Sequence, residues 1–284
     1  MRGPGYFVGL LGWPLDHTLS PAIHNAAFRR LGLDWTYYAW PVPPESLEAA
    51  IGGIRALGAM GANVTMPHKE AVIDQLDEVS GDAQAVGAVN TIQRYGDVLI
   101  GHNTDVDGFS SFLESDAGVE AAGARALVLG SGGAARAVVK ALDSLGAEEV
   151  IVAARDLERG DEVRVIAGRA RAEAAPWGRA VRLVPEMDFV VNATPLGMEG
   201  DDPLPGAIFR PGQLVVDLVY SPPASPLVRR ARAAGADAWG GLGMLVHQAA
   251  ASFRIWTGTD PSLETMSAAA LRAIGQRGPH ADGE

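Results

Sequence analysis

Along most of the chain, apolar runs of strand length alternate with segments in which apolar residues recur at helical spacing. This alternation is typical of βαβ units, in which helices cover a parallel sheet. The chain has 284 residues, which is enough for one large α/β domain or for two smaller ones with their own cores. The pattern predicts an α/β fold before any single motif is considered.

The first third of the chain predicts one α/β unit. Ser20 and Pro21 are expected to cap and open a helix, because serine accepts from free helical N–H groups and proline suits the first turn. Gly96 is expected at the turn of a hairpin. The expected strands are 6–11, 36–40, 61–65, 88–94 and 98–102, and the expected helices are 20–31, 45–57 and 67–76.

The middle block predicts an open parallel sheet with helices on both faces. The expected strands are 126–129, 149–154, 181–184, 189–192 and 214–218, and the expected helices are 108–115, one ending at Leu145, and 226–234. Residues 240–284 are predicted to be helical without a further strand, and 278–284 to be disordered. Because these helices need a surface to cover, we expect them to return to the first unit and leave a cleft between the two units for a ligand.

Composition excludes several functions. A net charge of −11 offers no basic stripe for nucleic acid, and the absence of cysteine excludes disulfides, thiolate nucleophiles and cysteine-bound zinc. The apolar runs are too short to cross a membrane, and the first residues do not resemble a signal peptide, so we predict a cytoplasmic protein. No metal site is predicted. We assign to hydrogen bonding or to the surface His17, His24, His68, His102 and His247.

A strand, a glycine turn and a helix follow one another in register at 126–145. Gly130, Gly132 and Ala135 match the G-x-G-x-x-A pattern, in which the glycines allow a tight turn and close approach to a pyrophosphate. The motif in this context predicts dinucleotide binding, and the alternative is a glycine turn without a ligand. The predicted contacts are Gly130, Ser131, Gly132, Gly133, Ala134 and Ala135.

The next strand ends where the adenosine ribose of a dinucleotide would lie. Arg155 and Arg159 suit a 2′-phosphate, whereas Asp156 suits a free 2′-hydroxyl. We therefore predict NADP as the cofactor and leave NAD open.

Seven segments, in order and spacing, resemble the shikimate dehydrogenase family: 17–25, 63–69, 87–91, 101–105, 192–198, 216–220 and 243–248. The resemblance implies a substrate-binding catalytic domain over 1–105 and 240–284 and a Rossmann-type NAD(P)-binding domain over 106–239. It also implies a catalytic pair, Lys69 and Asp105, beside the reacting carbonyl. The same resemblance implies that the substrate carboxylate is held by Thr18, Ser20 and Tyr220. It implies that the ring hydroxyls are bound by Thr65, Asn90 and Gln248. The residues implied to contact the cofactor are Asn192, Thr194, Leu218, Gly241 and Met244.

The chemistry agrees with these implied roles. Hydride transfer to a ketone leaves an oxyanion that must gain a proton, and a lysine ammonium can stabilise it and donate. A neighbouring carboxylate keeps such a lysine charged and oriented. Hydroxyl donors suit a substrate carboxylate that must later leave, since an arginine clamp would bind it more tightly.

The resemblance implies the NADP-dependent, reversible reduction of 3-dehydroshikimate to shikimate in aromatic amino-acid (chorismate) biosynthesis, by a monomer or homodimer. Two departures keep a quinate/shikimate dehydrogenase that uses NAD open. Thr18 stands where the family usually has serine, and Ala154-Arg155-Asp156 replaces the commoner Asn-Arg-Thr. A non-catalytic sensor of shikimate-like ligands is a third reading, which predicts loss of the Lys69–Asp105 pair or of the glycine turn. Both are present.

Overall fold

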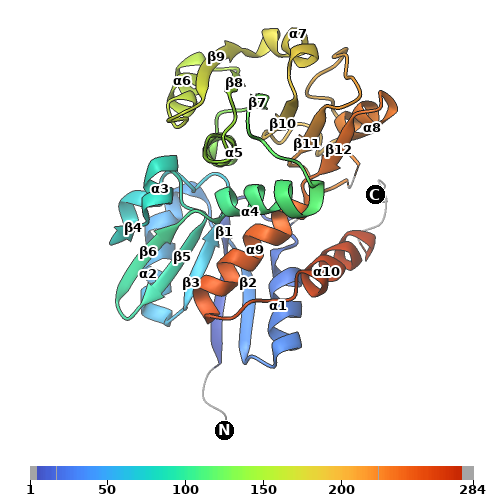
Figure 1. Cartoon of the computed structure of the whole chain (residues 1–284). Helices are drawn as coiled ribbons and strands as arrows, with labels where there is room; N and C mark the ends of the chain where they lie inside the picture. Colours follow the sequence, from blue (N-terminus) through green and yellow to red (C-terminus); the bar gives the residue numbers. More distant parts are fainter. Residues whose placement is uncertain (1–4, 17, 223, 277–284) are drawn as a thin grey trace, which may run out of the picture. The chain divides into compact units, whose positions relative to one another are not determined.

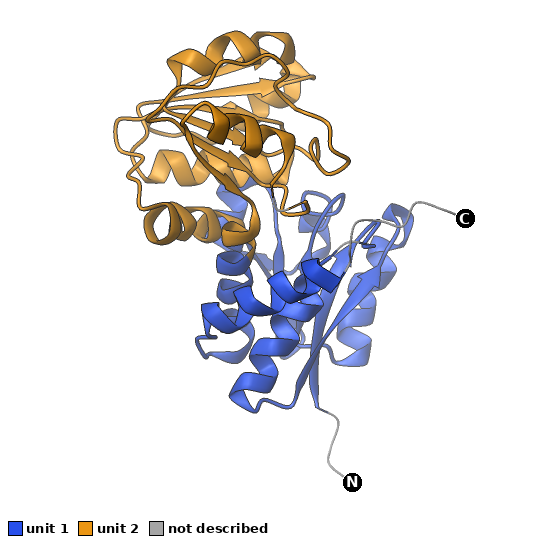
Figure 2. Ribbon diagram, turned by 90° about the vertical axis from the view of Figure 1, so that its right-hand side faces the viewer, with its two compact units in different colours: residues 1–104, 246–284 blue, residues 105–245 orange. Residues whose placement is uncertain are grey.

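The computed structural model describes residues 5–16, 18–222 and 224–276, so His17 and the tail predicted to be disordered lie outside the described residues. The chain divides into two compact units, coloured separately in Figure 2. Unit 1 comprises residues 1–104 and 246–284, and unit 2 comprises 105–245. The sequence placed the corresponding breaks after residues 105 and 239.

Unit 1 is built on a mixed sheet with the strand order β2-β1-β3-β5-β6-β4. Strand β1 is parallel to both β2 and β3, whereas β5 is antiparallel to β3 and β6. The predicted hairpin is β5–β6, with Gly96 at a φ of 63° in its turn. The strands are β1 (Tyr6–Gly12), β2 (Trp35–Pro41), β3 (Gly61–Val64), β4 (Glu78–Val79), β5 (Thr91–Tyr95) and β6 (Val98–His102).

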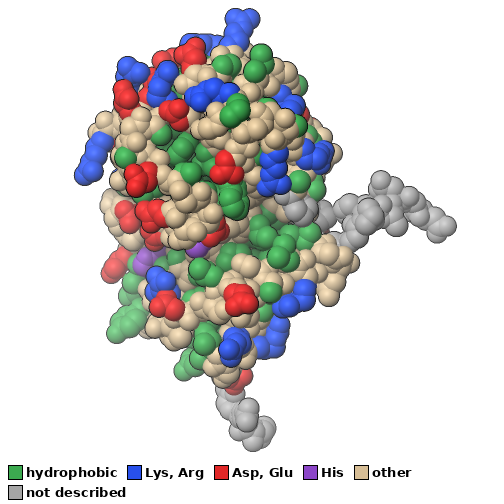
Figure 3. All heavy atoms as spheres, turned by 45° about the vertical axis from the view of Figure 1, so that its right-hand side comes forward, with side chains coloured by type: hydrophobic (Ala, Val, Ile, Leu, Met, Phe, Trp, Pro, Cys, Tyr) green, Lys and Arg blue, Asp and Glu red, His purple; other side chains and the backbone are tan. Residues whose placement is uncertain are grey.

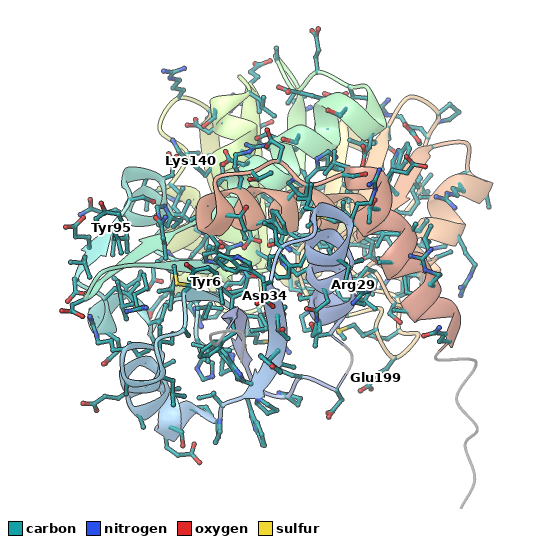
Figure 4. The ribbon with its side chains drawn as sticks, turned by 90° about the horizontal axis from the view of Figure 1, so that it is seen from below. Tyr6, Arg29, Asp34, Tyr95, Lys140 and Glu199 are labelled. Atoms are coloured by element: carbon teal, nitrogen blue, oxygen red, sulfur yellow. The ribbon has the colours of Figure 1, made fainter. Side chains whose placement is uncertain are left out.

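Strand β1 lies at the centre of this unit because its apolar residues are buried from Val8 to Leu11. At its start, the Tyr6 N–H donates to the Asp34 carbonyl at 2.9 Å, and Figure 4 labels both residues. The flanking helices are α1 (Ser20–Leu31) and α2 (Leu47–Leu57), the latter preceded by the 3₁₀ turn η1 (Pro44–Ser46). Helix α2 contributes its buried residues Leu47, Ile51 and Ile54 to the core.

Two predictions in unit 1 are wrong, and two short elements were missed. The expected helix at 67–76 is a series of turns that ends in η2 (Ile73–Gln75), because the Lys69 carbonyl accepts the Val89 N–H at 2.8 Å instead of a helical one. The cap of α1 is Leu19, without a capping side chain, and Ser20 is the first helical residue. Strand β4 and helix α3 (Gly81–Val86) were not predicted because they are too short to show a periodicity.

The C-terminal helices α9 (Leu242–Thr257), from Val246 onwards, and α10 (Leu263–Gln276) belong to unit 1, so the chain returns to this unit as predicted. Trp256 on α9 donates its indole N–H to the Ile92 carbonyl at 2.9 Å. Helix α10 packs along α1, and the two lie side by side in Figure 1.

Unit 2 contains a six-stranded sheet with the order β12-β11-β10-β7-β8-β9 and parallel pairing throughout. This is the doubly wound order of dinucleotide-binding folds, which reverses direction between β7 and β10. The two-domain α/β fold class is thus confirmed. The strands are β7 (Arg125–Leu129), β8 (Glu149–Ala154), β9 (Arg171–Pro176), β10 (Phe189–Asn192), β11 (Leu214–Asp217) and β12 (Asp237–Gly240), and the principal helices are α4 (Thr104–Phe112), α5 (Gly133–Ser144), α6 (Leu157–Arg164) and α8 (Pro226–Ala233).

The expected strand at 181–184 is helical. It forms α7 (Ala180–Leu183), between the 3₁₀ turns η4 (Trp177–Arg179) and η5 (Val184–Glu186). Ala180 and Val184 are fully buried in the core of unit 2, so the apolar run packs as one face of a helix. Strands β9 and β12 were not predicted, and α4 begins earlier than expected and continues into a π-helical turn, η3 (Leu113–Ala117).

Candidate functional site

Unit 1 contains a buried network of polar side chains around Asn63. Its Oδ1 accepts the Tyr37 hydroxyl proton at 2.8 Å. Its Nδ2 lies 3.0 Å from Thr91 Oγ1 and 2.9 Å from Ser252 Oγ. Because Asn63 and Thr91 are register partners on β3 and β5, the sheet fixes their spacing, and α9 supplies Ser252. All four side chains are buried or nearly so, and a satisfied buried network of this kind is rigid.

Asn90, predicted to bind a ring hydroxyl, belongs to the same network. Its Oδ1 accepts the Thr104 N–H at 2.7 Å, and its Nδ2 donates to Thr104 Oγ1 at 2.9 Å. Thr104 Oγ1 lies 3.0 Å from Ser252 Oγ, which donates to the Gln248 carbonyl at 3.0 Å. The network therefore joins the segments that carry two of the predicted ring-binding residues, Asn90 and Gln248.

Thr65 and Lys69 follow β3 and are both half-buried. The Thr65 N–H donates to the Leu11 carbonyl at 2.9 Å, and a Cβ on Gly12 would lie only 2.3 Å from Thr65 Cγ2. Glycine at position 12 therefore allows Thr65 its place against β1. The carbonyl of Lys69 is held by the Val89 N–H, so the backbone of both residues is fixed by neighbouring strands and loops.

Ser20 and Thr18 lie at the start of α1. Thr18 Oγ1 accepts the Ser20 N–H at 3.3 Å, and Ser20 is 8% exposed. Burial raises the pKa of the Tyr37 hydroxyl far above its ordinary value, and a hydrogen bond with Ser20 opposes part of that rise. Ser20 thus bonds a neutral phenol, and it does not cap the helix because it is already the first residue inside α1.

Tyr37 and Ser252 were not predicted as site residues. Tyr37 stands in a strand of aromatic residues, and Ser252 is one serine in a mostly apolar helix. The available signal was a single polar residue at a fully buried position of α9, which only the tertiary structure distinguishes from an exposed one.

His24 contradicts the assignment of the histidines to hydrogen bonds or to the surface. Its ring is fully buried, and neither nitrogen has a hydrogen-bond partner among the described residues. The ring stacks on Tyr37, with centroids 4.3 Å apart and planes 1° from parallel. Burial lowers the pKa of His24 to about 3, so the imidazole is neutral. His68 does follow the assignment, since its Nε2 lies 2.6 Å from the Val42 carbonyl oxygen.

In unit 2, the glycine turn after β7 has the features that a pyrophosphate needs. Gly130 has a φ of 110°, and a Cβ there would lie 2.9 Å from Thr194 Cγ2. Gly132 caps α5 without a side-chain hydrogen bond, and a Cβ on Gly132 would meet no atom of the described chain within 4 Å. The first turn of α5 carries no acidic residue. Its N–H groups and positive dipole end therefore suit a phosphate, and the residues fit a dinucleotide.

The other predicted members of the turn are placed consistently with this fit. Ser131, Gly133 and Ala134 lie around Gly132 at the surface of the turn. Ala135 is fully buried, and a larger residue there would push α5 away from the sheet.

At the end of β8, Asp156 is the N-cap of α6. Its Oδ1 accepts from the N–H groups of Glu158 at 3.0 Å and Arg159 at 3.3 Å. Arg155 and Arg159 are both exposed beside it. Because the Asp156 carboxylate is engaged by the helix, the two guanidinium groups dominate the local chemistry, and this favours a 2′-phosphate.

The segment after β10 is closed by Asn192, which is fully buried. Its Oδ1 accepts from the Thr194 N–H at 3.1 Å and the Thr194 hydroxyl at 2.6 Å, and its Nδ2 donates to the Leu196 carbonyl at 2.8 Å. The same segment lies against Gly130, so the loops after β7 and β10 meet at the point where the strand order reverses.

The remaining predicted residues of unit 2 lie at or after the ends of its elements. A Cβ on Gly241 would lie 2.1 Å from the Leu218 carbonyl oxygen, so these two backbones are in close contact. Met244 is 7% exposed on α9 and Asp105 is 5% exposed near the start of α4, whereas Tyr220 is half-buried. The structure thus places Thr18, Ser20, Thr65, Lys69, Asn90 and Gln248 in unit 1 and Asp105, Tyr220 and the predicted cofactor contacts in unit 2.

Three general features bear on other classes of function. Within the described ranges, no group of three or more histidine, aspartate or glutamate side chains could hold a metal ion. None of the described helices combines the length and apolarity needed to cross a bilayer. On the face shown in Figure 3, acidic and basic side chains are interspersed.

Three family models match the chain in succession. They are the shikimate dehydrogenase substrate-binding domain over residues 10–92, the shikimate/quinate 5-dehydrogenase model over 113–196, and the shikimate 5′-dehydrogenase C-terminal domain over 241–271. The matches follow the division seen in the fold, since the first and most of the last fall in unit 1 and the second falls in unit 2.

Whole-chain relatives agree with these models. The shikimate dehydrogenase (NADP(+)) of Symbiobacterium thermophilum is 47% identical over 96% of both chains, and that of Methanopyrus kandleri is 42% identical over 94% of this chain and 95% of its own. The shikimate 5-dehydrogenase of Thermus thermophilus, solved with NADP(H) and shikimate, is 40% identical with a TM-score of 0.86, covering 94% of this chain and 99% of its own. Quinate dehydrogenase from Corynebacterium glutamicum, solved with NAD, is 31% identical with a TM-score of 0.86 and the same coverage. The chain belongs to the shikimate dehydrogenase family.

Proposed function

We propose that this protein is an NADP-dependent shikimate dehydrogenase, which reversibly reduces 3-dehydroshikimate to shikimate in aromatic amino-acid biosynthesis. The proposal rests on two structural features that occur together in this member of the family. One is the open glycine turn at the N-terminus of α5, and the other is the pair of exposed arginines beside a capping Asp156. Together they suit a dinucleotide with a 2′-phosphate.

In this proposal unit 2 binds the cofactor and unit 1 binds the substrate. The N–H groups at 132–135 hold the pyrophosphate, and Arg155 and Arg159 hold the 2′-phosphate. The bound nicotinamide supplies the hydride for reduction and accepts it in the reverse direction. Asn192 and Thr194, at the end of β10 and in the loop that follows, are assigned to the nicotinamide end, and Leu218, Gly241 and Met244 are assigned to the cofactor as further contacts.

On the substrate side, Thr18 and Ser20 donate hydroxyl protons to the substrate carboxylate, with help from Tyr220. Thr65, Asn90 and Gln248 bind the ring hydroxyls. The buried Asn63 network supports this assignment, because it ties Asn90 and the Gln248 segment to one rigid set of side chains. Rigid support of this kind reduces the reorganisation needed when substrate binds.

The proton step is assigned to Lys69. As the ketone carbon gains hydride, the carbonyl oxygen becomes an oxyanion, and the Lys69 ammonium donates the proton that completes the alcohol. Asp105 keeps the lysine charged and oriented and, in the reverse direction, favours return of the proton to it. The proposal requires both side chains to lie beside the same carbonyl, with Asp105 acting through Lys69.

The deciding experiment is a kinetic grid of the purified protein with shikimate or quinate and with NADP⁺ or NAD⁺. We expect the largest kcat/KM for shikimate with NADP⁺. A larger value for quinate with NAD⁺ would favour the second candidate, a quinate/shikimate dehydrogenase, for which the specific observations are Thr18 and the similarity to the Corynebacterium glutamicum enzyme.

The same grid tests the sensor reading. If shikimate and NADP⁺ bind but the absorbance at the NADPH maximum does not change, the protein is a ligand sensor and not an enzyme. We also propose a cytoplasmic location and a monomeric or homodimeric state.

A further inference from the structure

Asp217, at the end of β11, is a fully buried carboxylate to which neither the sequence patterns nor the family resemblance assigned a role. Its Oδ1 accepts from Asn192 Nδ2 at 2.9 Å and from the Val219 N–H at 3.1 Å, and its Oδ2 accepts from the Ser225 hydroxyl at 2.5 Å. Burial raises the pKa of Asp217, and these three hydrogen bonds oppose the rise. Since all three partners donate, the contacts suit the ionised form.

Each partner of Asp217 belongs to a different segment. Asn192 ends β10 and closes the loop that contains Thr194 and Leu196. Ser225 caps α8 by accepting the Val228 N–H at 3.3 Å. One carboxylate therefore holds the loop after β10, the segment after β11 and the start of α8.

The loop after β10 also passes close to this carboxylate. A Cβ on Gly197, whose φ is 109°, would lie 3.4 Å from Asp217 Oδ2 and 3.6 Å from Ser225 Cβ. The space between Gly197 and the side chains of Asp217 and Ser225 is thus only about one carbon atom wide, and a longer side chain at position 217 would displace the loop.

The segment after β11 is fixed by the same group. While its N–H donates to Asp217, the carbonyl of Val219 accepts the Gly241 N–H at 3.0 Å, and the Leu218 N–H donates to the Asn192 carbonyl at 2.9 Å. Leu218 and Gly241 are proposed to contact the cofactor, and Tyr220, the next residue after Val219, is proposed to contact the substrate.

We propose that Asp217 is a positioning residue that sets the cofactor loop at 192–198 and the segment at 218–220 in one fixed relation. The inference rests on the proposed function, because that function gives these two segments their roles. Asp217 touches neither reactant in this scheme and acts through Asn192 and Val219.

The test compares Asp217→Asn with a matched control, Gln213→Leu. Gln213 lies just before the opposite end of β11, is 1% exposed, and donates from Nε2 to the carbonyls of Val184 and Met187, both at 2.7 Å. Both variants disturb a buried polar group beside the same strand, but only Asp217 contacts the proposed reactive segments. We would measure Tm, kcat, both KM values and the NADPH dissociation constant by fluorescence.

For Asp217→Asn we expect the KM and dissociation constant for NADPH to rise about 10-fold and kcat to fall by about 10- to 100-fold, the usual effect of a misplacement near 1 Å. Gln213→Leu should lower Tm at least as much and leave the kinetic constants within about twofold of the unmodified protein. Equal kinetic constants for Asp217→Asn and the unmodified protein, or equal kinetic losses in both variants, would overturn the inference.

Two further measurements keep the outcomes separate. If Asp217→Asn does not fold, Ser225→Ala removes one of the three donors and should raise the KM for NADPH by about threefold to 10-fold, and no change would count against Asp217. If the unmodified protein binds NADPH but reduces nothing, the proposed function fails. The NADPH dissociation constants of the variants then still decide whether Asp217 positions the loop.

Discussion

The imidazole of His24 lies flat against the ring of Tyr37, with 4.3 Å between the ring centroids and 1° between the planes. Tyr37 in turn bonds Ser20 and Asn63, so a residue without a hydrogen-bond partner in the described chain supports a tyrosine inside the polar network. This arrangement links the stability of unit 1 to pH.

Stability should fall as the pH drops below 6. Burial lowers the pKa of His24 from its ordinary value of 6.5 to about 3 in the folded chain, so the unfolded chain takes up the proton first. Between these values the free energy of unfolding should decrease by about 1.4 kcal/mol for each pH unit from this residue alone. Urea unfolding at pH 7, 6, 5 and 4 measures the slope.

A pair of variants isolates that contribution. His24→Phe keeps a stacked ring without a titrating group and should have a shallower slope than the unmodified protein. Tyr37→Phe removes the neighbouring hydroxyl and should lower stability by a similar amount at every pH in this range. An unchanged slope in His24→Phe would exclude His24 as the source.

Lys69→Ala should lower kcat by about 10² to 10⁴, with a smaller effect on KM, because a positioned acid is lost rather than a binding contact. The chain has only one other lysine, Lys140 on α5, so Lys140→Ala controls for loss of an ammonium group. Its kcat should stay near that of the unmodified protein. A rise in KM alone for Lys69→Ala would make the lysine a binding residue.

Asp105→Asn and Lys69→Ala should not be additive. If the Asp105 carboxylate acts by holding the Lys69 ammonium, Asp105→Asn should lower kcat about 10²-fold when Lys69 is present. The same substitution should change kcat little in the Lys69→Ala variant. Steady-state kinetics of both single variants and the double variant measure the coupling. Fully multiplicative losses would show that the two side chains act independently.

Cofactor preference should depend on Arg155. We expect Arg155→Ala to raise the KM for NADPH by about 10-fold and to change the KM for NADH little, since a free 2′-hydroxyl does not need the guanidinium. The ratio of the two kcat/KM values checks this. Equal decreases in kcat/KM with both cofactors would show that Arg155 does not contact the 2′-phosphate.

Two substitutions of Asp156 separate its role as a helix cap from the effect of its charge. Asp156→Ser retains a helix cap and removes the charge, so Tm should change little while preference shifts further towards NADPH. Asp156→Ala should shift preference similarly but cost about 1 kcal/mol of stability through loss of the cap. Identical Tm values for the two variants would contradict the capping role.

The elements that follow from local sequence patterns were predicted, and those that depend on contacts between distant segments were missed. The turn at Gly130 was predictable because strand, glycines and helix are contiguous in the chain. The short segment 181–184, with three apolar residues around Arg182, was misread as a strand, since a run that short fits one turn of a buried helix equally well. Strand β12, with four residues, shows no clear alternation.

The site was predicted unevenly for the same reason. The positions of Lys69, Asp105 and Asn90 were selected through the family resemblance, and their roles remain predictions. The partners of Asn63 and of Asp217 come from segments far apart in the chain, and nothing in the spacing of Tyr37, Ser225 or Ser252 indicates those contacts. Buried polar groups are recognised by their neighbours, which only the fold supplies.

The Asn63 network also sets an order of events during synthesis. Asn63 Nδ2 and Ser252 Oγ meet across 189 residues of sequence, whereas unit 2 is one uninterrupted stretch from residue 105 to 245. A growing chain can therefore close unit 2 while it is still being translated, but the polar centre of unit 1 must wait until α9 has emerged from the ribosome. Until then the emerged part of unit 1 exposes Asn63 and Thr91 and lacks the two helices that cover it, so a nascent chain that has left the ribosome only as far as residue 245 should display a folded insert within an unfinished host.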